Sequence, residues 1–235
     1  MQASLQPLCT WSQDHIFAGG AQNIVLLVEW RGAASLETES RTHKVAACDI
    51  ELRIWLEPHM QLTGLHGCRK WYGGDRSLLL PLGKIYAGQR KDVALEFSIQ
   101  SAPVGIHEAV WLQWAYKQPS SQRMRELPMQ KCSLQSVRHT GFLQESCCFY
   151  VEKHLELLKI EEVYESAELL RSQGKSGEAQ VIIRRQADKL LLLAVRSGDA
   201  QLLKEAESMY RMIEAEVFPL YKSYTNLSYH DCAVK

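Results

Sequence analysis

The chain has 235 residues, enough for one large domain or two modest domains that each bury a core. Hydrophobic residues make up 46% of the chain and charged residues 23%, which excludes the composition of a disordered or fibrous protein. Lysine plus arginine and aspartate plus glutamate both number 27, so no overall positive field favours nucleic acid as a partner.

The N-terminal part of the chain shows the alternation of apolar and polar residues that is typical of β-strands. Between Asp49 and Glu57 every second residue is apolar, which predicts a strand with one buried face. The same period recurs at 92–99 and 110–117, while 23–30 is apolar on both sides and is predicted to be a central strand. Further strands are predicted at 62–66, 76–80 and 129–137.

Turn-forming residues separate these segments about every ten residues, which is typical of two sheets that pack face to face. We therefore predict an antiparallel β-sandwich in residues 1–146, with its strands between about Asp14 and Thr140. The expected fold class is α+β, mainly β and then α.

From Cys148 onward the apolar period changes to three or four residues, which predicts three amphipathic helices. Residues 174–177 would end the first helix, Gly198 would end the second, and Asp199 would cap the third. Because the connections are short, we expect a three-helix antiparallel bundle at 147–220 and a tail at 221–235. The predicted buried faces are Leu157, Ile160, Tyr164, Ala167 and Leu170, then Ala179, Ile183, Ala187, Leu190 and Ala194, then Leu203, Ala206, Tyr210, Ile213 and Val217.

The longest apolar runs, at 24–28 and 190–195, are much shorter than the about 20 apolar residues of a membrane-spanning helix. Residues 1–11 lack the basic and apolar parts of a secretory signal, so we expect a cytoplasmic protein without a membrane span. The seven cysteines do not have the spacing of a small disulfide-rich domain, and we interpret them as reduced thiols. The adjacent Cys147 and Cys148 could instead form a redox-sensing bond.

Residues 174–176, Gly-Lys-Ser, match the end of a phosphate-binding loop, but Leu169 stands where that loop requires glycine. A helix-hairpin turn is the better interpretation. His59, His66 and Cys68, like the cluster at 230–232, lack the paired spacing of a zinc site, so structural or surface roles are favoured. We expect no metal, no other cofactor and no catalytic residue, although a catalytic site can assemble from distant positions.

Trp55 and Trp111 fall on the otherwise polar faces of their predicted strands. Such a large ring must be covered, either by the helices or a loop, or by a binding partner. The two tryptophans are therefore the candidate partner-binding residues.

Four segments, 49–53, 65–67, 74–89 and 93–97, resemble the β-domain that follows the von Willebrand factor type A domain in bacterial proteins of that superfamily. In those proteins a helical region follows the sandwich, loosely like a tetratricopeptide hairpin, and the pattern at 167–179 is similar to it. The resemblance implies the fold and a general role in protein interaction.

The type A domain itself is missing, together with the Asp-x-Ser-x-Ser loop that holds its divalent ion. Asp75–Leu79 lacks the second serine, so the resemblance carries over no site residue. The polar stretch Arg31–Lys44 would mark the place where that domain sits or was removed.

Taken together, these patterns favour a non-catalytic scaffold or interaction module that binds a protein partner or associates with itself. One alternative is a ligand-binding sandwich, for example for carbohydrate, that uses Trp55, Trp111 or Tyr72 as stacking platforms. Another is an enzyme with an unrecognised site.

Overall fold

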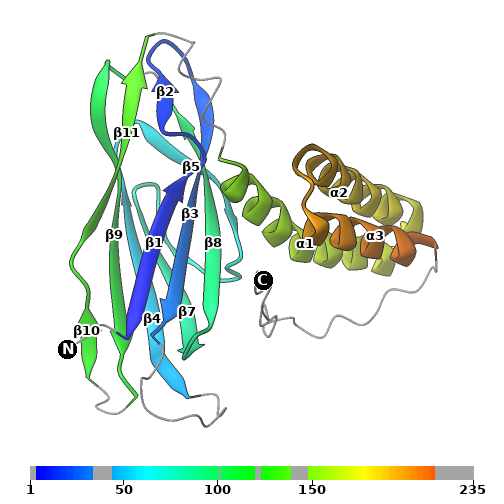
Figure 1. The fold of residues 1–235 in the computed structure, drawn as a ribbon, viewed down its shortest axis with the longest axis horizontal. Coiled ribbons are helices and arrows are strands. Elements are labelled where there is room, and N and C mark those ends of the chain that lie inside the picture. Colours follow the sequence, from blue (N-terminus) through cyan, green and yellow to red (C-terminus); the bar gives the residue numbers. More distant parts are fainter. Residues whose placement is uncertain (1–3, 34–43, 101, 120–122, 139–147, 215–235) are drawn as a thin grey trace. The chain divides into compact units, whose positions relative to one another are not determined.

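The computed structural model describes residues 4–33, 44–100, 102–119, 123–138 and 148–214. In these ranges the chain forms strands β1 to β11, followed by helices α1 to α3 (Figure 1). The predicted fold class, mainly β and then α, is confirmed. The chain divides into two compact units, Met1–His154 and Leu155–Lys235, and each is considered by itself.

The smaller sheet has four antiparallel strands in the order β1-β3-β8-β5. The strand predicted to be central, β3, is an inner strand of this sheet, and its Leu26 and Leu27 point to opposite faces yet are both fully buried. This double burial explains why the segment is apolar on both sides. The strands span Leu5–Trp11 (β1), Gln22–Gly32 (β3), Arg90–Ile99 (β8) and Met60–His66 (β5).

The larger sheet has seven strands, and its main path runs β2-β11-β9-β4-β7-β6, with β10 paired to β9. Its pairs are antiparallel except β2 with β11, which is parallel. The strands span His15–Phe17 (β2), Val45–Leu56 (β4), Tyr72–Gly74 (β6), Ser77–Tyr86 (β7), Gly105–Lys117 (β9), Met124–Glu126 (β10) and Gln130–Val137 (β11).

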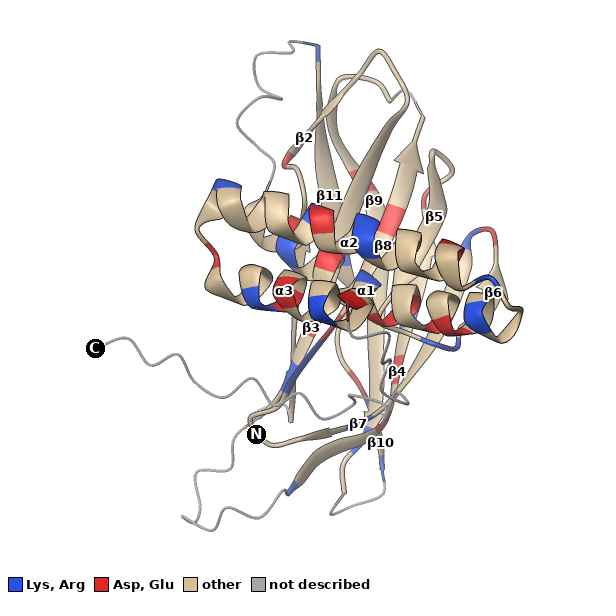
Figure 2. Cartoon of the chain, turned by 90° about the vertical axis from the view of Figure 1, so that its right-hand side faces the viewer, with Lys and Arg blue, Asp and Glu red and all other residues tan. Residues whose placement is uncertain are grey.

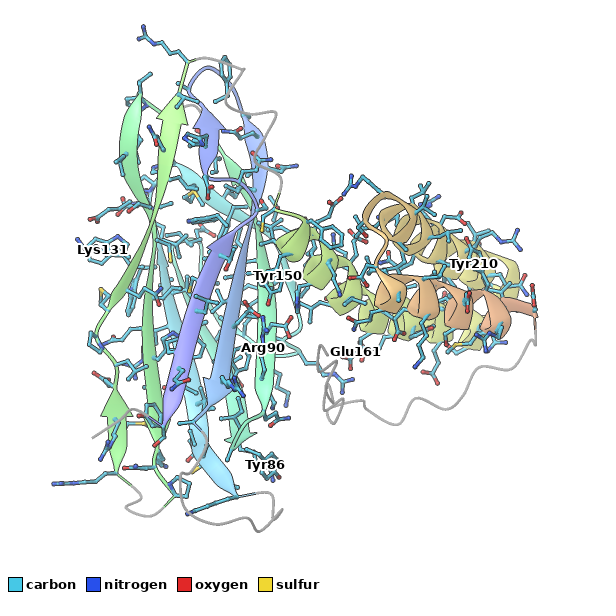
Figure 3. The ribbon with its side chains drawn as sticks, in the orientation of Figure 1. Tyr86, Arg90, Lys131, Tyr150, Glu161 and Tyr210 are labelled. Carbon is cyan, nitrogen blue, oxygen red and sulfur yellow. The ribbon has the colours of Figure 1, made fainter. Side chains whose placement is uncertain are left out.

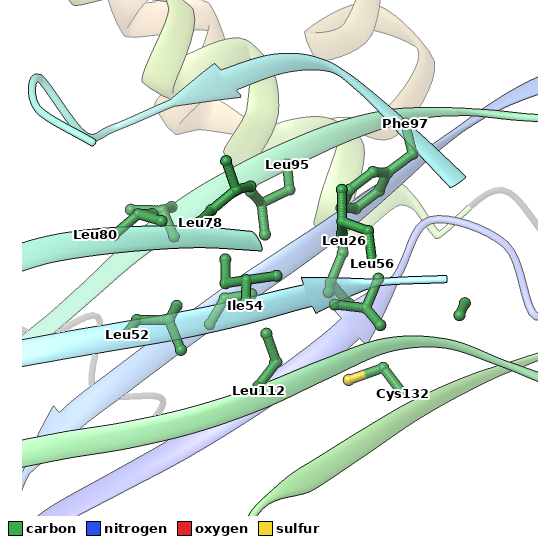
Figure 4. Packing of buried hydrophobic residues seen from close by; sticks show 14 of the residues in the cluster. Leu26, Leu52, Ile54, Leu56, Leu78, Leu80, Leu95, Phe97, Leu112 and Cys132 are labelled. Carbon is green, nitrogen blue, oxygen red and sulfur yellow. The ribbon is translucent and has the colours of Figure 1, made fainter. Parts of the chain in front are cut away.

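The two sheets bury their apolar faces against each other (Figure 4). Leu52 and Ile54 of β4 meet Leu95 and Phe97 of β8 in this core, and all four side chains are fully buried. Full burial of one such side chain is worth about 1.5–3 kcal/mol. The strict alternation at 49–57 thus gives the predicted half-buried strand.

The sandwich also contains strands that the sequence did not predict. β1 begins at Leu5, ahead of the expected start near Asp14, because exposed Leu8 and the edge-strand residue Pro7 disturb its alternation. β7 continues past Pro81 to Tyr86. The three-residue strands β2, β6 and β10 are too short to show a period.

The helices are α1 (Phe149–Ser172), α2 (Ser176–Ser197) and α3 (Ala200–Glu214). The predicted ends are confirmed: Gly198 has a left-handed backbone with φ of 70°, and the Asp199 carboxylate accepts from the amides of Gln201 and Leu202 at 3.0 and 3.1 Å. Gln186 of α2 donates to Glu156 of α1, and Tyr210 of α3 donates to Asp188 of α2. These bonds join the helices of the second unit.

The predicted face of α2 is confirmed, since all five of its residues are buried. The predicted face of α3 is wrong at Leu203, which is 41% exposed, while Leu202 is fully buried. Adjacent leucines fit a period of three to four residues equally well, so the period does not distinguish Leu202 from Leu203. The buried residues of α3 are Leu202, Ala206, Met209 and Ile213.

Charged residues of both signs are spread along the outer faces of the helices (Figure 2). Among the helices that the structure describes, none is long and apolar enough to cross a membrane. Val217 and the expected tail at 221–235 lie outside the described residues.

Candidate binding surface on the seven-stranded sheet

Trp55 of β4 and Trp111 of β9 are direct cross-strand partners. Their neighbours in sequence, such as Ile54 and Leu112, point into the core, so both indole rings lie on the outer face of the larger sheet. Both tryptophans are half-buried. The register of two strands far apart in the sequence thus brings together the two residues that the sequence singled out.

Lys131 of β11 lies on the same outer face beside the two tryptophans, because it is the cross-strand partner of Trp111. Its ammonium group lies 4.3 Å from the centre of the Trp111 ring and 2.7 Å from a carboxylate oxygen of Glu108. A cation over an indole face is attracted by the ring electrons. Figure 3 shows Lys131 projecting from β11 away from the sandwich interior.

A polar row lies next to the tryptophan pair on the same face. Arg53, two residues before Trp55, contacts Glu126 at 3.2 Å and Glu51 at 3.4 Å. Gln113 donates to the second oxygen of Glu126 at 3.4 Å. Each of these charges already has an opposite partner, so the row is a polar border beside the aromatic pair.

Tyr72 continues the aromatic character of this face toward β6. It pairs with Leu79, which in turn pairs with Arg53, so Tyr72 shares the face of the two tryptophans. The Tyr72 side chain is 59% exposed. We name Trp55, Trp111, Lys131, Arg53 and Tyr72 together the tryptophan face.

The other candidate residues of the sequence analysis are not brought together. His59 lies beside His107, with a ring-centre separation of 6.3 Å, and burial followed by the charge of His107 lowers its pKa. His66 instead contacts Glu96 at 3.0 Å, and the Cys68 thiol donates to the carbonyl of Lys70. No cluster of three metal-ligand side chains occurs in the part of the chain that the structure describes.

Gly174 and Lys175 lie in the turn between α1 and α2, where Gly174 has φ of 78°, and Ser176 begins α2. This is the expected helix-hairpin turn. Cys148 donates its backbone amide to the carbonyl of Ser12, whereas Cys147 and the cluster at 230–232 lie outside the described residues.

A second polar cluster, which the sequence analysis missed, lies on the outer face of the smaller sheet. Glu29 of β3 is 2% exposed and is the cross-strand partner of Asp92 of β8. Tyr150, in the first turn of α1, donates to Glu29 at 2.6 Å, and Arg90 forms an ion pair with the same carboxylate. His154 contacts Asp92 at 2.7 Å.

The chemistry of this cluster favours a structural role. Burial raises the pKa of Glu29 despite the nearby positive groups, His154 opposes the rise, and Asp92 adds to it. The Arg90 guanidinium also lies 5.5 Å from the centre of the Tyr150 ring, and both residues are labelled in Figure 3. The contacts hold the first turns of α1 against β3 and β8. The one sequence signal was a glutamate inside the apolar run 24–30.

Comparisons with known proteins show a similarity of fold and do not indicate a function. No protein-family model matches the sequence, and no curated protein matches it. Among solved structures, a paralogue of ArnB named VWA2 from Sulfolobus acidocaldarius is similar over 87% of this chain and 93% of its own, with a TM-score of 0.55 at 8% identity.

A von Willebrand factor type A protein from Catenulispora acidiphila is similar over 75% of this chain, with a TM-score of 0.50 at 16% identity. This chain spans 41% of the length of that protein. The structural neighbours therefore include von Willebrand factor type A proteins, in agreement with the resemblance found in the sequence.

Proposed function

We propose that this chain is a non-catalytic interaction module and that it binds a protein partner through the tryptophan face. The observation that carries the proposal is the direct pairing of Trp55 with Trp111 on an outer sheet surface. Half-exposed tryptophans at the centre of a surface are the residues that most often dominate binding energy between proteins.

The surroundings of the pair support a protein as the partner. Arg53 with Glu126 and Lys131 with Glu108 form ion pairs of both signs around the rings. An apolar centre with a charged border is the usual composition of a protein interface. A nucleic-acid partner would require more lysine and arginine than aspartate and glutamate, and in this chain the two numbers are equal.

We further infer that the chain corresponds to the accessory region of von Willebrand factor type A proteins, without the type A domain. The polar stretch Arg31–Lys44 of the sequence is the place where that domain would be inserted. This chain spans 41% of the Catenulispora protein but 93% of VWA2, so only the first coverage is compatible with a missing domain.

The test compares complexes formed by tagged wild-type chain and by the variants Trp55→Ala and Trp111→Ala. The chain is purified from its native cell, co-purifying proteins are identified by mass spectrometry, and the affinity of the recombinant pair is measured. We expect each substitution to weaken binding at least about tenfold. Thermal unfolding of each variant, measured in parallel, separates loss of binding from loss of folding.

Leu8→Ala is the matched control, because Leu8 is an apolar residue of β1, on the other sheet, and is 58% exposed. It should leave the complex intact. If the tryptophan variants unfold at lower temperature but bind as well as wild type, the rings are part of the internal packing and the proposal fails.

A second function is favoured by one observation, the position of Tyr72 on the same face as the tryptophans. Aromatic rings across neighbouring strands, next to Arg53 and Gln113, can stack on sugar rings and bond their hydroxyl groups. Titration with a panel of oligosaccharides, followed by tryptophan fluorescence, tests this alternative. If binding is saturable and both Tyr72→Ala and Trp111→Ala abolish it, the ligand of this face is a carbohydrate and not a protein.

A further inference from the structure

Two cysteines from different sheets meet inside the sandwich. Cys9 lies on β1 of the smaller sheet opposite Val28, and Cys132 lies on β11 of the larger sheet opposite Val110. Both valines are core residues, so both thiols point inward. Cys132 is 6% exposed, Cys9 packs against the same core, and their thiols are hydrogen-bonded to each other. Figure 4 shows Cys132 among the packed core residues.

The contact between the thiols makes them chemically unequal. A hydrogen bond from Cys9 lowers the pKa of Cys132, although burial opposes this effect. The pKa of Cys9 is strongly raised by its bond to Cys132, by burial and by the negative charges of Cys132 and Glu29. The first proton therefore leaves Cys132, and the thiol of Cys9 stabilises the resulting thiolate.

The other cysteines in the described sandwich have different partners. The thiol of Cys48 lies against the carbonyl of Lys117, and that of Cys68 against the carbonyl of Lys70. The thiols of Cys48 and Cys68 therefore form hydrogen bonds with the backbone, whereas the thiols of Cys9 and Cys132 form a hydrogen bond with each other. This contrast provides two control positions on the same domain.

We propose that Cys9 and Cys132 form a redox-sensitive dithiol, which a small hydroperoxide converts into a disulfide bond between the two sheets. A hydroperoxide is the oxidant that suits a buried thiol, because hydrogen peroxide is small and uncharged. The four-stranded and seven-stranded sheets, which are held by packing in the reduced chain, become covalently joined.

The reaction balances in two steps. The Cys132 thiolate attacks one oxygen of hydrogen peroxide, the oxygen–oxygen bond breaks, and the departing hydroxide takes up a proton to become water. The Cys9 sulfur then attacks the sulfenic sulfur of Cys132, which forms the disulfide and releases the second oxygen as water with the proton of Cys9. Two thiols and one peroxide thus give one disulfide and two water molecules.

The experiment treats the full-length reduced chain with hydrogen peroxide, blocks the remaining thiols and maps the peptides by mass spectrometry without reduction. We expect a peptide pair joined through Cys9 and Cys132 that dithiothreitol separates. We also expect the melting temperature to rise by about 5–15 °C, because the bond closes a long loop in the unfolded chain. Reduction should reverse the rise.

Cys9→Ala and Cys132→Ala should each lose the joined peptide and the rise in melting temperature, while Cys48→Ala and Cys68→Ala should keep both. The mapping of the wild-type chain decides the matter even if a core variant does not fold. The proposal is overturned if peroxide leaves Cys9 and Cys132 as separate thiols or oxyacids, or joins either of them to a different cysteine.

Discussion

At the scale of single residues, Glu29 places a carboxylate where water is nearly excluded. Its partners are Tyr150, Arg90 and, through Asp92, the imidazole of His154. Removing a buried carboxylate from water is costly, and its pKa is raised because that cost exceeds the attraction of the neighbouring cations. Glu29 therefore binds a proton more readily in the folded chain than in the unfolded one.

This difference predicts how the free energy of unfolding depends on pH. Because the folded state holds the extra proton, the contribution of Glu29 is fully present below its ordinary pKa of about 4.5 and is lost as pH rises through the raised value. Each unit of pKa difference corresponds to about 1.4 kcal/mol. Glu29→Gln should therefore flatten the fall in stability above pH 4.5, as measured by urea unfolding across a pH series.

The matched control is Glu178→Gln, which removes one carboxylate from an exposed position in α2. It should keep the wild-type slope above pH 4.5. A Glu29→Gln variant with an unchanged slope would mean that the buried carboxylate binds its proton equally well in both states.

At the scale of elements, the start of α3 depends on one side chain. The carboxylate of Asp199 accepts from two backbone amides that have no partner within the helix. Asp199→Ala should lower the free energy of unfolding of the helical unit by about 1 kcal/mol, measured by circular dichroism in urea. Asp199→Asn, which keeps an acceptor oxygen, should retain most of that stability, and equal loss in both variants would argue against the cap.

Strands and helices with a clear period could be predicted from the sequence, and β4, β9 and α2 are examples. The pattern fails where an element is too short, as in β2, or where adjacent apolar residues compete, as Leu202 and Leu203 do in α3. Period alone therefore identifies the elements better than it identifies their buried faces.

For the binding surface, the sequence could place Trp55 and Trp111 on polar faces but could not show that they meet. Their pairing depends on the register between β4 and β9, which is set by tertiary packing and by the bulge that precedes Glu51. The same limit applies to Lys131, whose position over Trp111 depends on the pairing of β11 with β9. Contacts between distant strands carry no local sequence signal.

At the scale of the whole molecule, the two compact units can be followed by different signals. All six tryptophans, at positions 11, 30, 55, 71, 111 and 114, belong to the first unit, while most helical residues belong to the second. Tryptophan fluorescence therefore follows the sandwich, and far-ultraviolet circular dichroism mainly follows the helices.

We predict that variants in one unit shift only the signal of that unit. Leu52→Ala, which leaves a cavity in the sandwich core, should destabilise the fluorescence transition by about 2–5 kcal/mol and leave the helical transition in place. Asp199→Ala should do the reverse. Equal shifts of both signals in either variant would show that the chain unfolds as one cooperative unit.

The parallel pairing of β2 with β11 has a consequence for the synthesis of the chain. His15–Phe17 is made more than a hundred residues before its partner residues Gln135–Val137. The nascent chain must therefore keep the strand edge of β2 unpaired until translation has passed Val137. Such distant pairing slows folding, so this edge is where we expect a chaperone to protect the growing polypeptide.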